Sequence, residues 1–583
     1  MNHPTPAIVA QSAVRRLPRL ALLLFCIAYV LSGFFGREPW KTSDMMSFGY
    51  MLELAQGHSD WFQPSMQGLQ PEIEALVPYW LGAWAMQSAP AFVAPDFAAR
   101  IPFGLLLTLS LVATWYAVYY LARSPSAQPV AFAFGGEAHP ADYARAMADG
   151  GLLALIACLG LAQLSHETTP ALAQLGFTSL TFFALAAMPY RLVVPAIGIA
   201  LGLIGLALSG APAMAAWLGL GGSVITVLDR HERRTLAAQA TGWAPLETPS
   251  DYRSLAWTAY VLAVTLVASG LAWHWNQWIW RIDLPQATWR DWGSLLRLLL
   301  WFVWPVWPLA LWTLWRWRKQ LFSGPLGRHL MLPLLFVAVG LGTTITTHSA
   351  DRSLLLALPA LATLAAFALP TLSRTVAAAI DWFTLLFFTV SGICIWVIWI
   401  AMQTGFPKQP AANVAKLAPG FTPTFSLFAF AVALAATLGW AWLVKWRVGR
   451  HRSAIWKSLV LPAGGTALCW LLLTTLWMPA LDFARSYAPM VRHIMPVIQA
   501  EAPQSCVERF GLDRGQIAAF KFHGQIKLQP ARRQAQCEWL LVDPADMSLL
   551  PQHVDMSQWK LRVNLKRRTQ TNDDMQLYRR VRP

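Results

Sequence analysis

The chain alternates long apolar runs with short polar segments over its first 478 residues. Shorter or glycine-rich apolar runs lie at about residues 150–165, 171–188, 192–209, 212–228 and 353–370. Eight longer runs have the length that a helix needs to cross a hydrocarbon core about 30 Å thick: Leu17–Phe35, Ile101–Leu121, Leu255–Trp273, Leu295–Trp315, Leu330–Thr347, Ile380–Ala401, Phe425–Val444 and Leu459–Met478. The pattern predicts an α-helical polytopic membrane protein with about thirteen transmembrane helices.

Basic residues gather on one side of the predicted spans. Lys and Arg clusters at 15–19, 230–234, 316–319 and 445–452 all fall on that side if the spans alternate. Because such residues are retained in cytoplasmic loops, we expect a cytoplasmic N-terminus. No small-residue cleavage site follows the first apolar run, so it is predicted to be an uncleaved helix. The outer segments are then Arg37–Arg100, Ser165–Pro170, Ser209–Pro212, His274–Gly293, His348–Ser353, Gln403–Thr422 and the chain after about Pro479.

The composition agrees with a membrane protein. Apolar residues make up 56% of the 583 residues, charged residues only 13%, and there are 31 Trp. The formal net charge is +16. Basic anchors near anionic membrane lipids account for part of this charge, so no nucleic-acid partner is expected.

The pattern changes after Met478, where alternating stretches replace the apolar runs. Gln536–Asp543 and Trp559–Leu565 predict strands, and Tyr487–Ala500 predicts a helix. We therefore expect a transmembrane domain over 1–478 and a small α/β domain over 479–583 on the outer side. This domain contains Cys506 and Cys537, which an oxidising compartment would allow to form a disulfide. The sequence does not decide whether they pair.

The first outer loop is long, and long structured loops are usually functional. It contains Pro39–Asp44, Asp60–Pro64, Pro78–Ala83 and Asp96–Pro102. In this order and spacing the segments resemble the first loop of GT-C glycosyltransferases of the lipid A aminoarabinose transferase and protein O-mannosyltransferase type. The resemblance continues through Gly198–Pro212, Asp351–Pro359 and Leu476–Tyr487.

This resemblance implies a GT-C transmembrane domain with interfacial helices in the loop 37–100. It also implies a multi-pass enzyme of the bacterial inner membrane whose active site faces the periplasm. The donor would be a sugar linked to polyprenyl phosphate, and the acceptor lipid A, a glycan or a protein. The expected partners are therefore membrane lipids, this donor and its acceptor.

Sugar transfer from a lipid phosphate needs a base for the acceptor proton and positive charge or a metal at the departing phosphate. The resemblance makes Asp44 the base, and the alternative is a residue that caps the following helix. It makes Glu167 the second acid, beside His166. A divalent metal held by Asp44 and Glu167 stays open, as does a purely structural loop.

Glu74 stands where the family has a lysine thought to hold the donor phosphate. Arg352 is the favoured replacement because a guanidinium can grip phosphate with two nitrogens. The alternatives for Arg352 are an interfacial anchor and an ion pair with Asp351. Arg37 and Arg100 are further phosphate candidates. The predicted acceptor groove comprises Glu72, Glu74, His166, His348 and Asp351.

Two other classes compete with this hypothesis. A lipid-linked polysaccharide ligase or polymerase would also use outward loops, but the first-loop pattern fits it less well. A polytopic transporter or flippase would usually show internal repeats and ionisable residues inside spans, and neither is clear here. The sequence leaves open the sugar, the acceptor, the prenyl length and the oligomeric state.

Overall fold

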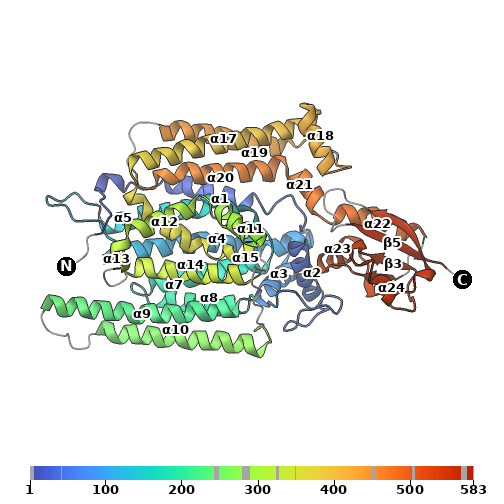
Figure 1. The fold of residues 1–583 in the computed structure, drawn as a ribbon, viewed down its shortest axis with the longest axis horizontal. Helices are drawn as coiled ribbons and strands as arrows, with labels where there is room; N and C mark the ends of the chain where they lie inside the picture. The colour runs from blue at the N-terminus through green and yellow to red at the C-terminus, as the bar shows by residue number, and fades with distance from the viewer. Residues whose placement is uncertain are drawn as a thin grey trace.

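The computed structural model contains a helical body and a smaller sheet domain at its C-terminal end (Figure 1). The spanning helices run roughly parallel, with α17 and α19 on one flank and α9 and α10 on the opposite flank. The structure describes residues 5–40, 42–241, 249–278, 289–322, 327–347, 350–448, 454–501, 506–565 and 574–581.

Most of the predicted spans are present as helices. Eight helices in the described residues are long and apolar enough to cross a membrane: α4 (Pro95–Ala122), α7 (Pro170–Ala187), α9 (Pro212–Thr241), α10 (Pro249–His274), α14 (Arg328–Thr346), α17 (Arg374–Thr404), α19 (Leu427–Val448) and α20 (Lys457–Leu476). Shorter apolar helices are α1 (Arg19–Leu31), α8 (Val193–Ala207) and α16 (Leu358–Ala368). The protein is thus a multi-pass membrane protein. The total of about thirteen spans stays a prediction.

Two predicted runs are interrupted. The run Leu295–Trp315 was expected to form one helix, but it forms α11 (Trp289–Phe302) and α12 (Val306–Arg316), which are bent by 87°. Pro305 lies between them and has no backbone N–H with which to continue a helix. The run at 150–165 belongs to α5 (Pro140–Ala157) and α6 (Leu159–Leu164), so its helix begins ten residues before the apolar run. The remaining short helices are α13 (Arg318–Phe322), α15 (Ala350–Leu355) and α18 (Lys408–Leu417).

The first outer loop folds into two helices that lie between the helical body and the sheet domain (Figure 1). They are α2 (Ser43–Ala55) and α3 (Val77–Ser88). The interfacial position expected for the helices of this loop stays a prediction. Helix α2 is buried from Asp44 to Leu54 and packs as a core helix between the helical body and the C-terminal domain.

The C-terminal domain begins with α21 (Met478–Arg485) and α22 (Ala488–Glu501). Its sheet has the order β2-β1-β3-β5-β4, parallel among the first three strands and antiparallel among the last three. The helix and strands predicted here are confirmed. The elements are β1 (Val507–Phe510), α23 (Arg514–Gly524), β2 (Leu528–Pro530), β3 (Trp539–Val542), α24 (Leu550–His553), β4 (Trp559–Leu565) and β5 (Met575–Arg580).

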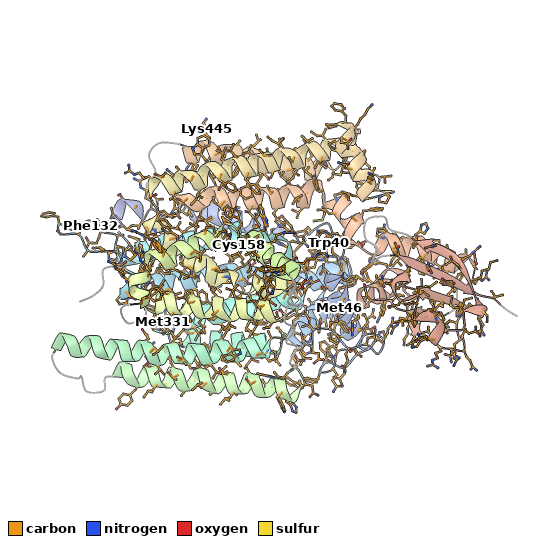
Figure 2. All side chains as sticks on the ribbon, in the orientation of Figure 1. Trp40, Met46, Phe132, Cys158, Met331 and Lys445 are labelled. Carbon is orange, nitrogen blue, oxygen red and sulfur yellow. A yellow bond between two sulfur atoms is a disulfide. The ribbon has the colours of Figure 1, made fainter. Side chains whose placement is uncertain are left out.

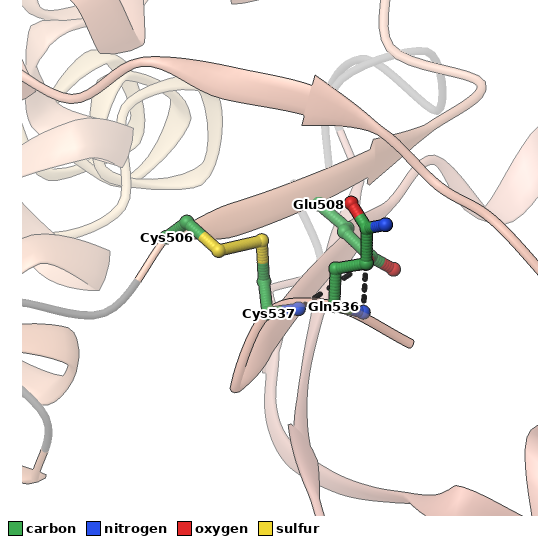
Figure 3. The surroundings of a disulfide bond; sticks show 4 residues. All are labelled: Cys506, Glu508, Gln536 and Cys537. Carbon is green, nitrogen blue, oxygen red and sulfur yellow. Dashed lines mark hydrogen bonds between the residues drawn. A yellow bond between two sulfur atoms is a disulfide. The ribbon is translucent and has the colours of Figure 1, made fainter. Parts of the chain in front are cut away.

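A disulfide between Cys506 and Cys537 ties the start of β1 to the segment before β3 (Figure 3). Buried Glu508 reinforces this junction, because its Oε1 accepts hydrogen bonds from the backbone N–H of Gln536 (2.7 Å) and Cys537 (3.3 Å). The pairing that the sequence left open is thus present.

Helix α23 docks the C-terminal domain on α2. A Cβ at Gly49 would lie 2.6 Å from the Cβ of Ala518, so glycine allows the two helices to approach closely. Lys521 Nζ pairs with the buried Glu53 Oε2 at 2.6 Å. The sheet domain is therefore fixed to the first outer loop by packing and by charge.

The topology can be tested by cysteine labelling in spheroplasts. Gln409→Cys and Gln552→Cys should react with a membrane-impermeant maleimide, whereas Arg318→Cys should react only after permeabilisation. Labelling of Gln552→Cys only after permeabilisation would mean an even number of spans before the C-terminal domain. The background protein should carry serine at the free cysteines Cys26, Cys158, Cys394 and Cys469.

Candidate active site

Three segments far apart in sequence meet at the end of the helical body that faces the C-terminal domain. They are the turn after α1, the loop 165–169 between α6 and α7, and α15. Figure 2 places Trp40, which belongs to the first segment, toward the C-terminal domain, and Phe132 at the opposite end. The meeting point brings together two acids and two arginines that the sequence singled out.

Asp44 lies in the first turn of α2 and is 1% exposed. Its Oδ2 accepts hydrogen bonds from Arg37 Nη1 (2.9 Å) and the backbone N–H of Trp40 (3.1 Å). Its Oδ1 accepts from the backbone N–H of Thr168 (2.8 Å) and from the Thr168 hydroxyl. Burial opposes ionisation of Asp44, but Arg37 and Thr168 outweigh it, and the pKa of Asp44 lies below its ordinary value. Asp44 is therefore held as a fully hydrogen-bonded carboxylate.

Arg37 is the counterion of Asp44 and is also buried. Its other nitrogens donate to the backbone oxygens of Gly33 (3.1 Å) and His166 (2.5 Å), and its guanidinium lies 4.7 Å from the Trp40 ring centre. All three nitrogens of Arg37 are thus engaged within the protein. Its predicted contact with donor phosphate would have to use the second N–H of a terminal nitrogen, on a side chain that is almost fully buried.

Arg100, the other predicted phosphate ligand of this region, is on α4. Its Nη2 donates to Asp96 Oδ2 (2.8 Å) and its Nη1 to the backbone oxygen of Phe34 (3.4 Å). The Arg100 side chain is buried and paired with Asp96. Its positive charge also helps to lower the pKa of Asp44.

Glu167 and Arg352 form the second acid–arginine pair, with Oε2 and Nη2 3.3 Å apart. The Glu167 side chain is 7% exposed, and its Oε1 accepts from Gln163 Nε2 at 3.3 Å. Burial, and next the charge of Asp44, raise the pKa of Glu167; Arg352 and Arg37 offset this only in part. Glu167 is thus the more easily protonated of the two acids.

Arg352 differs from Arg37 in being partly exposed and in having a nitrogen that makes no hydrogen bond. Its side chain is 24% exposed, and its buried Nε has no hydrogen-bond partner in the part of the chain that the structure describes. Asp351 Oδ1 accepts from the backbone N–H of Arg352 at 2.9 Å, and the ion pair of Arg352 is made with Glu167. Arg352 can therefore accept an additional anion.

His166 packs against α1. Its Nδ1 lies 2.5 Å from the backbone oxygen of Ala162 and its Nε2 lies 3.0 Å from that of Tyr29. A Cβ at Gly33 would come within 2.3 Å of the ring, and the Trp470 ring lies at 4.8 Å between centres. Burial lowers the pKa of His166 to about 4. This placement makes His166 a spacer between α1 and the loop.

The two groove candidates of the first loop, Glu72 and Glu74, have other neighbours. Glu72 is in a non-helical segment and pairs with Arg514 of α23 at 3.0 Å. Glu74 lies beside the turn between α8 and α9, where a Cβ at Gly210 would be 3.2 Å from its backbone oxygen. His348 lies outside the described residues.

Sequence reasoning missed the residues that hold Asp44 in place. Thr168 supplies two hydrogen bonds to it, and its only sequence signal was its position after Glu167. Asp482 of α21 accepts from the backbone N–H of Glu38 (2.9 Å) and from Trp40 Nε1 (3.0 Å). Trp40 therefore links the C-terminal segment to Asp44.

A metal site at Asp44 and Glu167 does not fit the surrounding donors. Each Asp44 oxygen already accepts two hydrogen bonds, and a cationic arginine lies beside each acid. Nowhere in the described ranges do three or more His, Cys, Asp or Glu side chains form a group that could hold a metal ion.

The buried pair predicts a specific pattern of stability. Arg37→Gln or Asp44→Asn alone should cost about 3–5 kcal/mol, because each leaves a buried charge without its partner. The double variant should recover most of this loss, since both charges are then removed. The measurement is thermal or denaturant unfolding in detergent.

The matched control is Arg492→Gln, which breaks the exposed ion pair with Glu38 and should cost less than about 1 kcal/mol. Single variants as stable as the wild type would show that the Arg37–Asp44 pair does not anchor this region.

No family model and no curated protein matches the chain. Two solved structures are similar to it. The apo structure of ArnT from Cupriavidus metallidurans has a TM-score of 0.58 and 14% identity, with 96% of each chain covered. The structure of the same ArnT bound to undecaprenyl phosphate has a TM-score of 0.57 and 14% identity, covering 96% of this chain and 97% of that one. The chain therefore has the fold of ArnT over nearly its whole length, which confirms the fold class that the sequence predicted.

Proposed function

We propose that this protein is a membrane glycosyltransferase that takes a sugar from a polyprenyl-phosphate donor at the periplasmic face of the inner membrane. The observation that carries the proposal is the Glu167–Arg352 pair, which joins a buried acid to an arginine with a free donor. The pair belongs to a chain with an ArnT-like fold, and one of the two similar ArnT structures has undecaprenyl phosphate bound. The acceptor is lipid A, a glycan or a protein.

Arg352 is the proposed ligand of the donor phosphate. When the bond to the sugar breaks, the phosphate gains negative charge, and a guanidinium close by stabilises that charge most where water is scarce. Arg352 is partly exposed and uses only one terminal nitrogen in its ion pair, so its guanidinium has N–H groups left for a two-pronged contact with phosphate. Arg37 and Arg100 are buried and stay paired with Asp44 and Asp96, and they add to the positive electrostatic potential at the site.

Glu167 is the proposed base, and this choice departs from the sequence prediction for Asp44. A carboxylate with a raised pKa accepts a proton more readily than one with a lowered pKa. Asp44 has no hydrogen-bonding site left over, whereas Glu167 has one modest contact at each oxygen. Asp44 then serves to hold Arg37 and the loop 165–169 in position.

The reaction is a direct displacement. The acceptor oxygen attacks the anomeric carbon while its proton passes to the Glu167 carboxylate. The bond between the anomeric carbon and the phosphate oxygen breaks, and its electron pair leaves with polyprenyl phosphate beside Arg352. The configuration of the sugar is inverted. Mass spectrometry of lipid A, glycans and envelope proteins from cells with and without the gene would identify the product.

If Arg352 binds the donor phosphate, its substitution should weaken donor binding far more than substitution of Arg492. Arg352→Ala should weaken binding of polyprenyl phosphate in nanodiscs by at least about tenfold, in line with the loss of a charge-assisted hydrogen bond. Arg352→Lys should recover only part of the affinity, because a point charge replaces a two-pronged donor. Arg492→Ala is the control, since Arg492 is also paired with a glutamate but is 70% exposed. Equal affinity of wild type and Arg352→Ala would make Arg352 an interfacial anchor.

The two acids can be separated by the pH dependence of transfer. Glu167→Gln should lower the rate by about 100-fold or more. In the wild type the rate should fall as pH drops below the raised pKa of Glu167, because the base must be unprotonated. The rate is measured in membrane vesicles by following the product identified above. If Glu167→Gln retains full activity while Asp44→Asn, folded as judged by its unfolding curve, has none, then Asp44 is the base.

A further inference from the structure

A groove runs between α1, α4 and α5 and contains none of the site residues described above. Its volume is about 480 Å³, and most of its lining is apolar. Leu23 and Ile27 of α1 and Val112 and Tyr116 of α4 line it and are each more than two-fifths exposed. In a membrane such exposed apolar walls contact hydrocarbon chains, so the groove is suited to an acyl chain.

One end of the groove is basic. Arg16, Arg19 and Arg145 line it there. Arg16 and Arg145 share one carboxylate, Asp142, at 3.1 and 3.4 Å. Arg19 makes no hydrogen bond or ion pair with the rest of the described chain and is exposed. This mouth therefore has more positive than negative charge.

The acid inside the groove, Asp149, makes no salt bridge within the described residues, although the charge of Arg19 acts on it. Asp149 Oδ1 accepts from Trp115 Nε1 at 2.8 Å, and its Oδ2 accepts from the backbone N–H of Leu17 at 3.4 Å. These bonds fasten the residues before α1 to α4 and α5. The guanidinium groups at the mouth thus remain available to an outside anion.

The basic mouth lies at the N-terminal end of α1, which the distribution of Lys and Arg assigns to the cytoplasmic side. Glu167 and Arg352 lie beyond the opposite end of α1, where the donor headgroup would bind. A lipid with its headgroup at the mouth is therefore a different molecule from the donor. Anionic phospholipids are plentiful in the cytoplasmic leaflet and attract basic segments.

We propose that this groove binds one anionic phospholipid of the cytoplasmic leaflet, with its phosphate among Arg16, Arg19 and Arg145 and an acyl chain between α1 and α4. The lipid fills the space beside α1. Because α1 leads directly into Gly33 and Arg37, which contact His166 and Asp44, a filled groove also steadies the turn that holds Asp44.

The test is native mass spectrometry of the delipidated full-length protein titrated with phosphatidylglycerol or phosphatidylcholine. The wild type should retain one phosphatidylglycerol with at least tenfold preference. Arg19→Gln/Arg145→Gln should lose that preference, and Val112→Trp, which fills the groove from a lipid-facing position, should lose the bound lipid. The control Arg318→Gln/Lys319→Gln removes two charges from another predicted cytoplasmic loop and should behave like the wild type.

The same titration contains the outcomes that would overturn the proposal. If the arginine double variant keeps the wild-type preference, these arginines only anchor α1 at the interface. If Val112→Trp, monodisperse on size exclusion, still retains phosphatidylglycerol, the lipid binds elsewhere. If polyprenyl phosphate displaces phosphatidylglycerol at equal concentration, the groove belongs to the donor. None of these readouts depends on transferase activity, so failure here leaves the proposed function standing.

Discussion

The buried ion pair between Arg37 and Asp44 is the constraint on which the end of the helical body next to the C-terminal domain depends. A charge in such a position is tolerated only with a partner and hydrogen bonds, so every group around it is placed to supply them. Arg37 joins the turn after α1 to the loop that carries His166, and Asp44 joins α2 to Thr168. This pair thus fastens the stretch that runs from the end of α1 into α2 to the loop 165–169, which is more than 120 residues away in sequence.

The two acid–arginine pairs differ in how deeply their side chains are buried and in how completely they are hydrogen-bonded. Arg37 and Asp44 are both almost fully buried, with every polar atom engaged, and this makes them a fixed electrostatic support. Glu167 is buried but loosely bonded, and Arg352 is partly exposed with a spare nitrogen. In the proposed reaction, a fixed positive charge next to an arginine that can bind an anion would stabilise the departing phosphate. The closed pair therefore positions the open one.

The C-terminal domain is part of this arrangement. Helix α23 packs on α2 through Gly49 and Ala518, and the buried Glu53 pairs with Lys521. Asp482 holds Trp40, whose backbone N–H in turn donates to Asp44. A movement of the domain would therefore shift α2 and Trp40, and with them Asp44.

The sequence by itself determined the helices, the sheet domain and the fold class, because apolar run length and strand alternation are local properties. It also singled out Asp44, Glu167 and Arg352. It could not place the bend between α11 and α12 or the burial of α2, since these depend on packing. Only the tertiary structure decided which acid pairs with which arginine, and therefore which carboxyl group has the raised pKa. Such pairings arise between residues far apart in the chain, and their electrostatics depend on burial that no local pattern records.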